Sequence, residues 1–261
     1  MNILEEIYQH KLVEVRNKKK IKNLQEICKD IKCSENSSCN FIQAIIDKKN
    51  QQKNALICEV KKASPSKGII RSDFNHIEIA MHYQEAGACC ISVLTDEKFF
   101  KGSDSYLKDI RLQTSIPLLR KDFIVDEYQI YEAKMLGADC ILLIIAMLND
   151  QKLSDLERCA SSLNLSVLLE IHDLQDLQRA MNLESKLIGI NNRNLRNFEV
   201  NVNNTINLSK YIPKDYIIAS ESGINSIDDI KKLNDVGISC FLIGEHFMRQ
   251  KNIVKAVKEF L

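Results

Sequence analysis

Eight short apolar runs, most of them rich in β-branched residues, recur along the chain and predict eight buried β-strands. They are ALICEV at 55–60, CCISVLT at 89–95, IPLLRKDF at 116–123, CILLIIA at 140–146, SVLLEIH at 166–172, LIGINNR at 187–193, YIIASES at 216–222 and CFLIGEH at 240–246. Between them, apolar residues recur at helical spacing, for example at 77–87, 127–137, 153–164 and 226–237. Strand and helix patterns therefore alternate from residue 55 onward.

This alternation is typical of α/β folds, and eight units within roughly 250 residues favour a closed barrel over a doubly wound sheet. Three similar segments, EAGACCI, MLGADCI and DVGISCF, support a modular chain, because their glycines at 87, 137 and 237 lie 50 and 100 residues apart. A glycine just after a helix permits the left-handed conformation that ends it, although three independent caps would give the same pattern. We predict a single (β/α)8 TIM barrel over residues 51–261.

Residues 1–50 lie outside the eight units and predict an N-terminal helical extension packed on the barrel. The segment reads as two or three helices, including LEEIYQHKLVEVRNKKK and NFIQAIIDKK, and the run Lys18–Lys20 is typical of a solvated helix face. Because it precedes the first strand directly, the extension can cover the barrel bottom or reach over its mouth. The sequence leaves both arrangements open.

Composition narrows the class of protein. The chain has 261 residues and a formal net charge of +1, which offers no field for binding nucleic acid or an acidic membrane surface. The longest apolar run covers only residues 140–148, whereas a membrane span needs about 18 residues. Glu5 and Glu6 stand where a signal peptide would need basic and apolar residues. We expect a cytoplasmic protein that binds neither nucleic acid nor membranes.

Cysteine and histidine spacing indicates neither a disulfide framework nor a metal site. The nine cysteines are an odd number, and several lie in apolar runs where a reduced thiol packs as a small hydrophobe. Cys28, Cys33 and Cys39 lack both the spacing and the nearby histidine of a zinc site. The five histidines form no HExxH motif, so we predict no metal.

Polar residues collect where the predicted strands end, which is where barrels of this class build active sites. These residues are Glu59 and Lys61, Lys121 and Asp122, Glu170, Asn191 to Arg193, Ser220 to Gly223, and Gly244 and Glu245. Alternation along the first strand turns Glu59 and Lys61 to the same inward side. Lysines and glutamates facing one cavity perturb each other's pKa values and suit acid–base catalysis. The alternative is a purely structural network of ion pairs, but such a network is a poor explanation for polar residues at five strand ends at once.

A second group of residues indicates a phosphate site. The segments SESGI and IGEHF each offer a glycine that lets backbone amides approach a ligand, with a helix amino terminus behind it. Ser64 and Arg193 can complete the anion site from the opposite wall. Their alternative roles are a turn residue and a salt bridge at the rim.

Several of these segments together resemble the indole-3-glycerol phosphate synthase family. They are EVKKASPSKG, SVLTDEKFFKGS, LRKDFIVDEYQIYEA, LGADCILLI, IGINNRNL, ESGI and LIGEHFMR, in this order and over nearly the whole chain. The resemblance implies conversion of 1-(2-carboxyphenylamino)-1-deoxyribulose 5-phosphate into indole-3-glycerol phosphate in tryptophan biosynthesis. Carbon dioxide and water are released, and the resemblance implies no cofactor or metal.

The resemblance also implies a role for each site residue. Lys121 would be the general acid, Lys61 would pair with the substrate carboxylate and serve in dehydration, and Glu59 would be its acid–base partner. Glu170 would orient Lys121, and Asn191, Glu221 and Ser222 would position the substrate. The phosphate would bind to Ser64, Arg193, Gly223, Gly244 and Glu245, and the apolar wall would consist of Phe99, Phe123, Leu142 and Leu195.

Two other functions compete with this interpretation. Phosphoribosylanthranilate isomerase uses a smaller barrel with a cysteine base, but Cys58 points to the opposite face from Glu59. A non-catalytic barrel would lack at least one strand-end residue of the catalytic set, and all are present. We expect a monomeric enzyme that acts on a phosphorylated small molecule, with contacts to neighbouring enzymes of its pathway as an open option.

Overall fold

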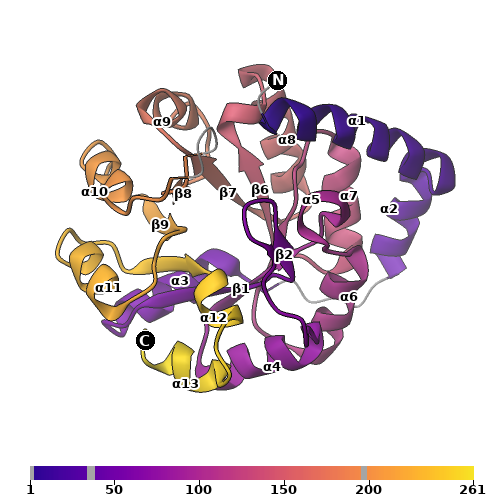
Figure 1. The fold of residues 1–261 in the computed structure, drawn as a ribbon. Helices are drawn as coiled ribbons and strands as arrows, with labels where there is room; N and C mark the ends of the chain where they lie inside the picture. The colour runs from indigo at the N-terminus through magenta and orange to yellow at the C-terminus, as the bar shows by residue number, and fades with distance from the viewer. Residues whose placement is uncertain (1–2, 34–38, 195–198) are drawn as a thin grey trace.

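The computed structural model describes residues 3–33, 39–194 and 199–261. Eight parallel strands close into a barrel in the order β1-β10-β9-β8-β7-β6-β5-β4 (Figure 1). They are β1 (Ala55–Val60), β4 (Cys90–Leu94), β5 (Leu118–Lys121), β6 (Cys140–Ile144), β7 (Ser166–Ile171), β8 (Leu187–Asn191), β9 (Ile217–Glu221) and β10 (Cys240–Ile243). The prediction of a (β/α)8 barrel with eight strands in these positions is confirmed.

Helices surround the barrel on its outside (Figure 1). They are α1 (Ile3–Ile21), α2 (Leu24–Cys33), α3 (Phe41–Asn50), α4 (His76–Ala86), α5 (Glu97–Phe100), α6 (Asp104–Gln113), α7 (Glu127–Leu136), α8 (Asp150–Ser162), α9 (Leu174–Ala180), α10 (Asn203–Ser209), α11 (Ile227–Asn234), α12 (Glu245–Met248) and α13 (Ile253–Lys258), with a 3₁₀ turn η1 (Ile145–Met147). Within the described ranges, no helix is long and apolar enough to cross a membrane.

A short antiparallel hairpin follows the first strand. It pairs β2 (Ala63–Ser64) with β3 (Gly68–Ile69), and the sequence patterns did not predict it. Strands of two residues are too short to show a period of hydrophobicity. The hairpin lifts the segment after β1 over the end of the barrel where the other strands finish, and its Ser64 lines the cavity there.

Alternation along the strands divides the apolar residues into two cores. Leu56 and Cys58 of β1 face the outer helices, where they join the cluster that includes Tyr83 of α4. Ala55 and Ile57 face the barrel interior and join the cluster that includes Leu168. Because side chains alternate with a period of two, Glu59 faces the interior as well, one layer above Ile57. The inner core thus fills the amino-terminal half of the barrel and leaves the carboxyl ends to polar residues.

Local signals in the sequence set where the helices begin and end. Asp126 caps α7 in a reciprocal capping box with Gln129. Gly87 and Gly137 end α4 and α7 with φ values of 100° and 91°. Gly237 is also left-handed, at φ 85°, but follows α11 by three residues. The predicted left-handed glycines are therefore confirmed at all three positions.

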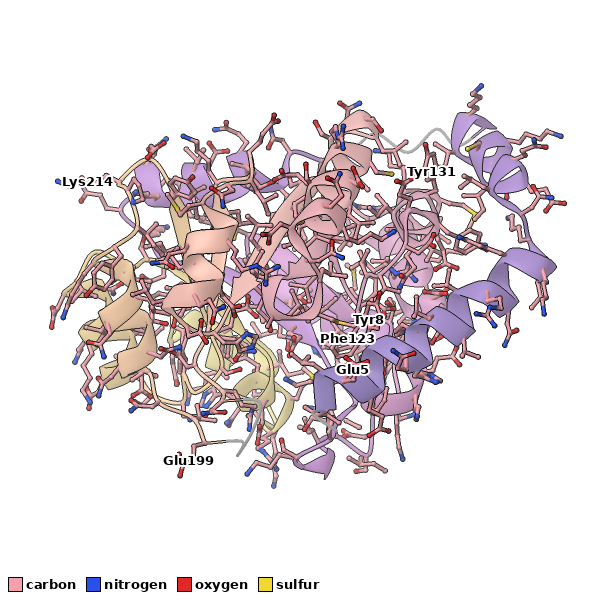
Figure 2. The ribbon with its side chains drawn as sticks, turned by 90° about the horizontal axis from the view of Figure 1, so that it is seen from above. Glu5, Tyr8, Phe123, Tyr131, Glu199 and Lys214 are labelled. Atoms are coloured by element: carbon pink, nitrogen blue, oxygen red, sulfur yellow. The ribbon has the colours of Figure 1, made fainter. Side chains whose placement is uncertain are left out.

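The N-terminal extension lies at both ends of the barrel, so both arrangements that the sequence left open occur. Phe41 and Ile45 of α3 belong to the inner core and close the barrel bottom beside Cys90. The first turns of α1 reach the mouth, where Ile3 and Ile7 line the main cavity. In Figure 2, Glu5 and Tyr8 on α1 lie on the same side of the molecule as Phe123, and Lys214 lies on the other side. The boundary at residue 50 between the N-terminal extension and the barrel domain stays a prediction.

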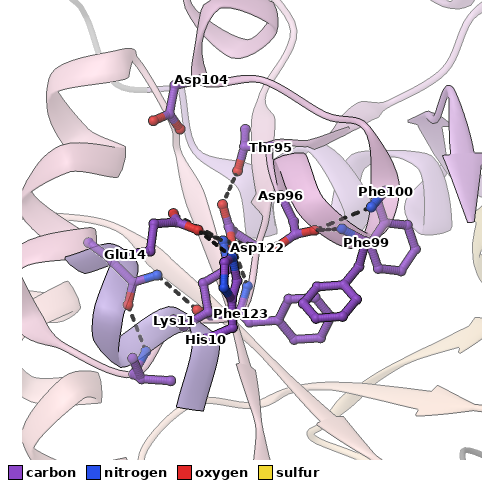
Figure 3. Close-up of polar contacts among 12 residues, drawn as sticks. His10, Lys11, Glu14, Thr95, Asp96, Phe99, Phe100, Asp104, Asp122 and Phe123 are labelled. Carbon is purple, nitrogen blue, oxygen red and sulfur yellow. Dashed lines mark hydrogen bonds and ion pairs between the residues drawn. The ribbon is translucent and has the colours of Figure 1, made fainter. Parts of the chain in front are cut away.

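A buried ion cluster fastens α1 to the barrel (Figure 3). Lys11 has no exposed surface, and its Nζ lies 2.8 Å from Asp122 Oδ1, 3.0 Å from Asp96 Oδ2 and 3.1 Å from Glu14 Oε2. Burial favours the neutral acid of Asp122, but Lys11 and Arg120 outweigh it and lower the pKa of Asp122 to about 2. The carboxylates that end β4 and β5 therefore depend on a cation from α1.

We expect Lys11→Met to destabilise the protein by about 3–5 kcal/mol, because it removes the buried cation that contacts both Asp96 and Asp122. Urea unfolding followed by circular dichroism measures this free energy. Lys19→Met is the matched control, since the Lys19 side chain on the same helix is 45% exposed and pairs with Asp126 at 2.8 Å. Its loss should cost less than about 1 kcal/mol. Equal effects of the two substitutions would contradict the role of Lys11.

Candidate active site

A cavity of about 350 Å³ opens at the carboxyl ends of the strands. Thirteen of the sixteen residues to which the family resemblance gives a role line it: Glu59, Lys61, Ser64, Lys121, Phe123, Leu142, Glu170, Asn191, Arg193, Glu221, Ser222, Gly223 and Glu245. The predicted strand-end residue Asp122 lines it as well. Segments far apart in the sequence thus meet at one rim, as a closed parallel barrel requires.

Three predicted site residues are placed differently. Phe99 lies behind the wall, with its ring 6.4 Å from that of Phe123, and its neighbour Phe100 lines the cavity instead. Gly244 lies behind Glu59 rather than in the lining, because a Cβ there would come within 2.3 Å of Glu59 Oε2. Leu195 lies outside the described residues.

Lys121 lies at the centre of the charged cluster. Its Nζ donates to Glu170 Oε2 at 2.9 Å and to Glu221 Oε2 at 2.8 Å. The second oxygen of Glu170 accepts a hydrogen bond from Asn191 Nδ2 at 3.1 Å. β5, β7, β8 and β9 each supply one of these residues at or near the strand's last position. The end of each strand therefore aims its polar side chain into the barrel.

The charges in this cluster are strongly coupled. Burial favours the neutral amine of Lys121, but Glu170 and Glu221 outweigh it and raise its pKa. Burial likewise opposes the charge on Glu170, yet Lys121 brings the pKa of Glu170 well below its usual range. Burial raises the pKa of Glu221 to about 7, and the negative charge of Glu170 adds to this although Lys121 opposes it. The two carboxyls around one ammonium thus differ in acidity.

A second lysine–glutamate pair lies beside the first. Lys61 Nζ is 2.5 Å from Glu59 Oε2, which agrees with the predicted inward direction of both side chains. Glycines make the space for the carboxylates. A Cβ on Gly189 of β8 would come within 2.0 Å of Glu221 Oε1, just as one on Gly244 would collide with Glu59. Any larger residue at these two positions would displace a charged group of the site.

The opposite wall carries polar groups suited to an anion. Ser64 Oγ is buried and has no hydrogen-bond partner in the described part of the chain. Arg193 Nη1 lies 3.5 Å from Ser66 Oγ, and Arg193 Nη2 lies 3.8 Å from Glu245 Oε2. A guanidinium presents N–H donors in a planar fork that matches a phosphate group, and Arg193 lines this wall of the cavity.

The turn after β9 has an unusual backbone. Ser222 and Gly223 have φ values of 65° and 78°, and Ser222 is one of few residues other than glycine in this region. Asn192 Nδ2 donates to the carbonyl oxygen of Ser222 at 3.1 Å and helps to hold the turn. Left-handed residues of this kind cluster at ligand sites, where they turn backbone groups toward the ligand.

Two kinds of residue at this site were not predicted from the sequence. His172 lies behind Glu170, with Nε2 3.3 Å from Glu170 Oε1. The sequence offers one signal for it, because His172 stands two residues after Glu170 at the end of the same strand. Ile3, Leu4 and Ile7 of α1 and Phe100 of α5 contribute to the apolar wall, and no periodicity in the sequence could place helices against this mouth.

The alternatives raised by the sequence can now be compared with the geometry. Cys58 is fully buried in the outer core beside Tyr83, and burial raises the pKa of its thiol well above the usual range. It does not line the cavity, so it is not placed to act as a base. Among the residues that the structure describes, no three His, Cys, Asp or Glu side chains form a group that could hold a metal ion.

Known proteins share both the sequence and the fold. The chain is 49% identical over 260 residues to the indole-3-glycerol phosphate synthase of Legionella pneumophila (strain Paris), covering 100% of this chain and 98% of the relative. It is 47% identical over 261 residues to that of Thermoanaerobacter pseudethanolicus, covering 99% and 97%. A crystal structure of 3-hexulose-6-phosphate synthase, at 13% identity, superposes with a TM-score of 0.65 over 79% of this chain and 97% of that chain, which is a likeness of fold alone.

The family model agrees with these relatives over the same extent of sequence. The model described as indole-3-glycerol phosphate synthase matches residues 4–260, which include the N-terminal helices as well as the barrel. The chain therefore belongs to the indole-3-glycerol phosphate synthase family.

Proposed function

We propose that this cavity converts 1-(2-carboxyphenylamino)-1-deoxyribulose 5-phosphate into indole-3-glycerol phosphate, carbon dioxide and water. The chain is thus a carboxy-lyase of tryptophan biosynthesis, as its family membership indicates. The observation that carries the assignment of roles is the Lys121 ammonium held between Glu170 and Glu221 in the cavity, with the Arg193 guanidinium on the facing wall. One cavity thus contains both an acid–base centre around Lys121 and a separate anion site at Arg193.

Lys121 is the general acid in this proposal. Ring closure joins the aromatic carbon that bears the carboxylate to the ketone carbon of the substrate, and negative charge develops on the ketone oxygen. An ammonium beside that oxygen stabilises the charge and then transfers a proton to it. Because Glu170 and Glu221 keep Lys121 protonated, the acid is in its active form throughout the neutral range.

Lys61 and Glu59 act on the rest of the reaction. The Lys61 ammonium pairs with the substrate carboxylate, and the electron pair released as carbon dioxide departs restores the aromatic ring. The hydroxyl formed at the former ketone carbon then leaves as water, with a proton from Lys61, while Glu59 accepts a proton from the neighbouring carbon. The 2.5 Å contact between Lys61 and Glu59 supports this shared role.

The remaining predicted residues bind the substrate. Asn191 and Ser222 position its hydroxyls, and Phe123 and Leu142 pack against its ring. Ser64, Arg193, Gly223 and the segment at Gly244 and Glu245 hold the phosphate, which the unpaired Ser64 hydroxyl supports. Gly244 contributes by leaving room for Glu59, and Phe99 by supporting Phe123 from behind.

Composition supports the rest of the assignment. With a net charge of +1, the chain offers no attraction to polyanions, and we assign it to the cytoplasm as an enzyme that binds neither nucleic acid nor membranes. We propose a monomer, because its most exposed large apolar residues, such as Ile21, Leu112 and Tyr211, lie on different elements. Contact with neighbouring enzymes of the pathway stays a prediction.

The reaction can be followed by fluorescence, since the product indole-3-glycerol phosphate contains an indole ring and the chain contains no Trp. Lys121→Ala should abolish turnover because it removes the ammonium beside the ketone oxygen, while substrate affinity stays within about tenfold, or 1.4 kcal/mol. Lys186→Ala is the control, because this exposed lysine precedes β8 at the far end of the barrel. Full activity of Lys121→Ala would contradict the mechanism.

Arg193→Ala should raise KM at least about tenfold with a smaller effect on kcat, because it removes charge-assisted hydrogen bonds to a phosphate far from the reacting atoms. Steady-state kinetics separates the two constants. Arg249→Ala is a matched control, since Arg249 also pairs with Glu245, at 2.9 Å, but does not line the cavity. An unchanged KM for Arg193→Ala would count against the phosphate assignment.

Glu221→Gln should stabilise the free enzyme at pH 8 by about 1–3 kcal/mol while impairing turnover. The pKa of Glu221 rises from 4.5 to about 7 on folding, so the native protein binds this proton more tightly than the unfolded chain. The resulting stability is complete below pH 4.5 and is lost as the pH rises through 7. The gain from Gln should therefore shrink at pH 5, and urea unfolding at both pH values tests this. A less stable variant at pH 8 would be the opposite result.

A further inference from the structure

The cavity holds more carboxylates than lysines. Glu59, Glu170 and Glu221 face Lys61 and Lys121, and the proposed substrate brings a further carboxylate to the same end. An unbalanced carboxylate in such a cluster takes up a proton, and a protonated Glu170 could no longer serve as an anionic partner of Lys121. A third cation beside Glu170 would keep this carboxylate ionised and leave the proton to another carboxyl of the cluster, such as Glu221.

His172 supplies a ring in the required place. It directly follows β7, and its side chain is 14% exposed. Nε2 lies 3.3 Å from Glu170 Oε1, and Nδ1 lies 3.4 Å from Asp176 Oδ2. A neutral imidazole has one N–H and one lone pair, so it would turn the lone pair toward one of these carboxylates. Neither ring nitrogen makes a hydrogen bond within the described part of the chain, so both contacts are charge contacts, and only the positively charged imidazolium attracts both carboxylates.

The surroundings of the ring hold it in this position. Asp176 belongs to α9 and accepts the backbone N–H of His172 at 3.0 Å, and Asp173 in turn caps the backbone N–H of Asp176 at 2.9 Å. Asn204 of α10 donates to the carbonyl oxygen of His172 at 3.0 Å. Within the described ranges, the ion-pair contacts of the ring are those with the carboxylates of Glu170 and Asp176.

We propose that His172 is a positioning residue, an imidazolium between Asp176 and Glu170 that keeps the Glu170 carboxylate ionised and aimed at Lys121. This inference rests on the proposed roles of Glu170 and Lys121. His172 does not line the cavity, so it acts through Glu170 and not on the substrate. The ring lies beside Glu170 Oε1, which accepts a hydrogen bond from Asn191, while Glu170 Oε2 accepts one from Lys121.

The electrostatics agree with this geometry. Burial favours the neutral ring, but Asp176 and Glu170 outweigh it and raise the pKa of His172 to about 10. The positive charge therefore persists across the neutral range, unlike that of an ordinary histidine. His172 acts as a constant charge in this site rather than as a pH switch.

The first experiment compares His172→Gln with the wild type in the fluorescence assay over a range of pH. Removing the cation should raise the proton affinity of the coupled carboxyl cluster and move the acidic limb of the kcat profile up by about one pH unit. On that limb kcat should fall about tenfold, and at high pH it should recover toward the wild-type value. KM should change less than about threefold, because the phosphate site is untouched.

His76→Gln is the matched control. His76 Nε2 also contacts a carboxylate, that of Asp109 at 3.0 Å, but its place on α4 is outside the cavity lining. Its pH profile should superimpose on that of the wild type. A profile of His172→Gln that also superimposes, or a loss of kcat that is uniform across pH in a normally folded variant, would overturn the proposal.

A second measurement requires neither a variant nor turnover. Nuclear magnetic resonance of ring-labelled histidine in the intact protein reports the charge of each of the five histidines. One ring should remain protonated at pH 8, and titration of all five below pH 7 would overturn the proposal. If the wild type forms no indole product, the proposed function fails, while this titration still tests the imidazolium.

Discussion

The need to neutralise buried charge at the carboxyl end of β5 organises much of this structure. Alternation along β5 sends the Lys121 ammonium toward the carboxylates of the cavity, whereas the charged groups of Arg120 and Asp122 meet the outer helices. Asp122 also contributes to the cavity lining. Arg120 is fully buried and contacts Glu132 of α7 at 2.6 Å and Asp104 of α6 at 2.7 Å, and Asp122 meets Lys11 of α1. The ionic contacts that hold the outer helices are thus adjacent in sequence to the proposed acid, and a shift of β5 would disturb both.

The charged groups at the carboxyl ends of the strands make this part of the barrel less stable than an apolar core would. Glu221 is ionised only with difficulty, and the barrel omits side chains at Gly189 and Gly244 to admit the carboxylates. A packed interior would place apolar groups in this space, as the amino-terminal half of the barrel does. The barrel therefore has two parts along its axis. The apolar core at the amino-terminal ends of the strands stabilises the fold, and the charged groups at their carboxyl ends form the candidate site.

Much of this arrangement could be predicted from the sequence, because alternation is a local property. The strands, the inward direction of Glu59 and Lys61, and the polar strand ends all follow from a period of two. Contacts between distant segments could not be predicted in this way. No pattern pairs Lys11 with Asp122 or separates Phe100 from Phe99 at the cavity wall. The spacing of the histidines, compared with metal-binding motifs, gives no sign that His172 lies behind Glu170. The family resemblance implied roles for the residues that line the cavity, whereas the supporting residues Lys11 and His172 were found from their contacts in the structure.

The fastening of α1 also bears on how the chain folds during synthesis. Lys18 of α1 reaches Glu132 across 114 residues of sequence, and Lys11 must wait almost as long for Asp122. At about 5–20 residues per second, these partners leave the ribosome roughly 6–20 seconds after α1 does. Through this interval the first helix carries a lysine whose buried site does not yet exist. Docking of α1 is therefore a late step, and the helix that lines part of the mouth arrives only after β5 and α7 have been made.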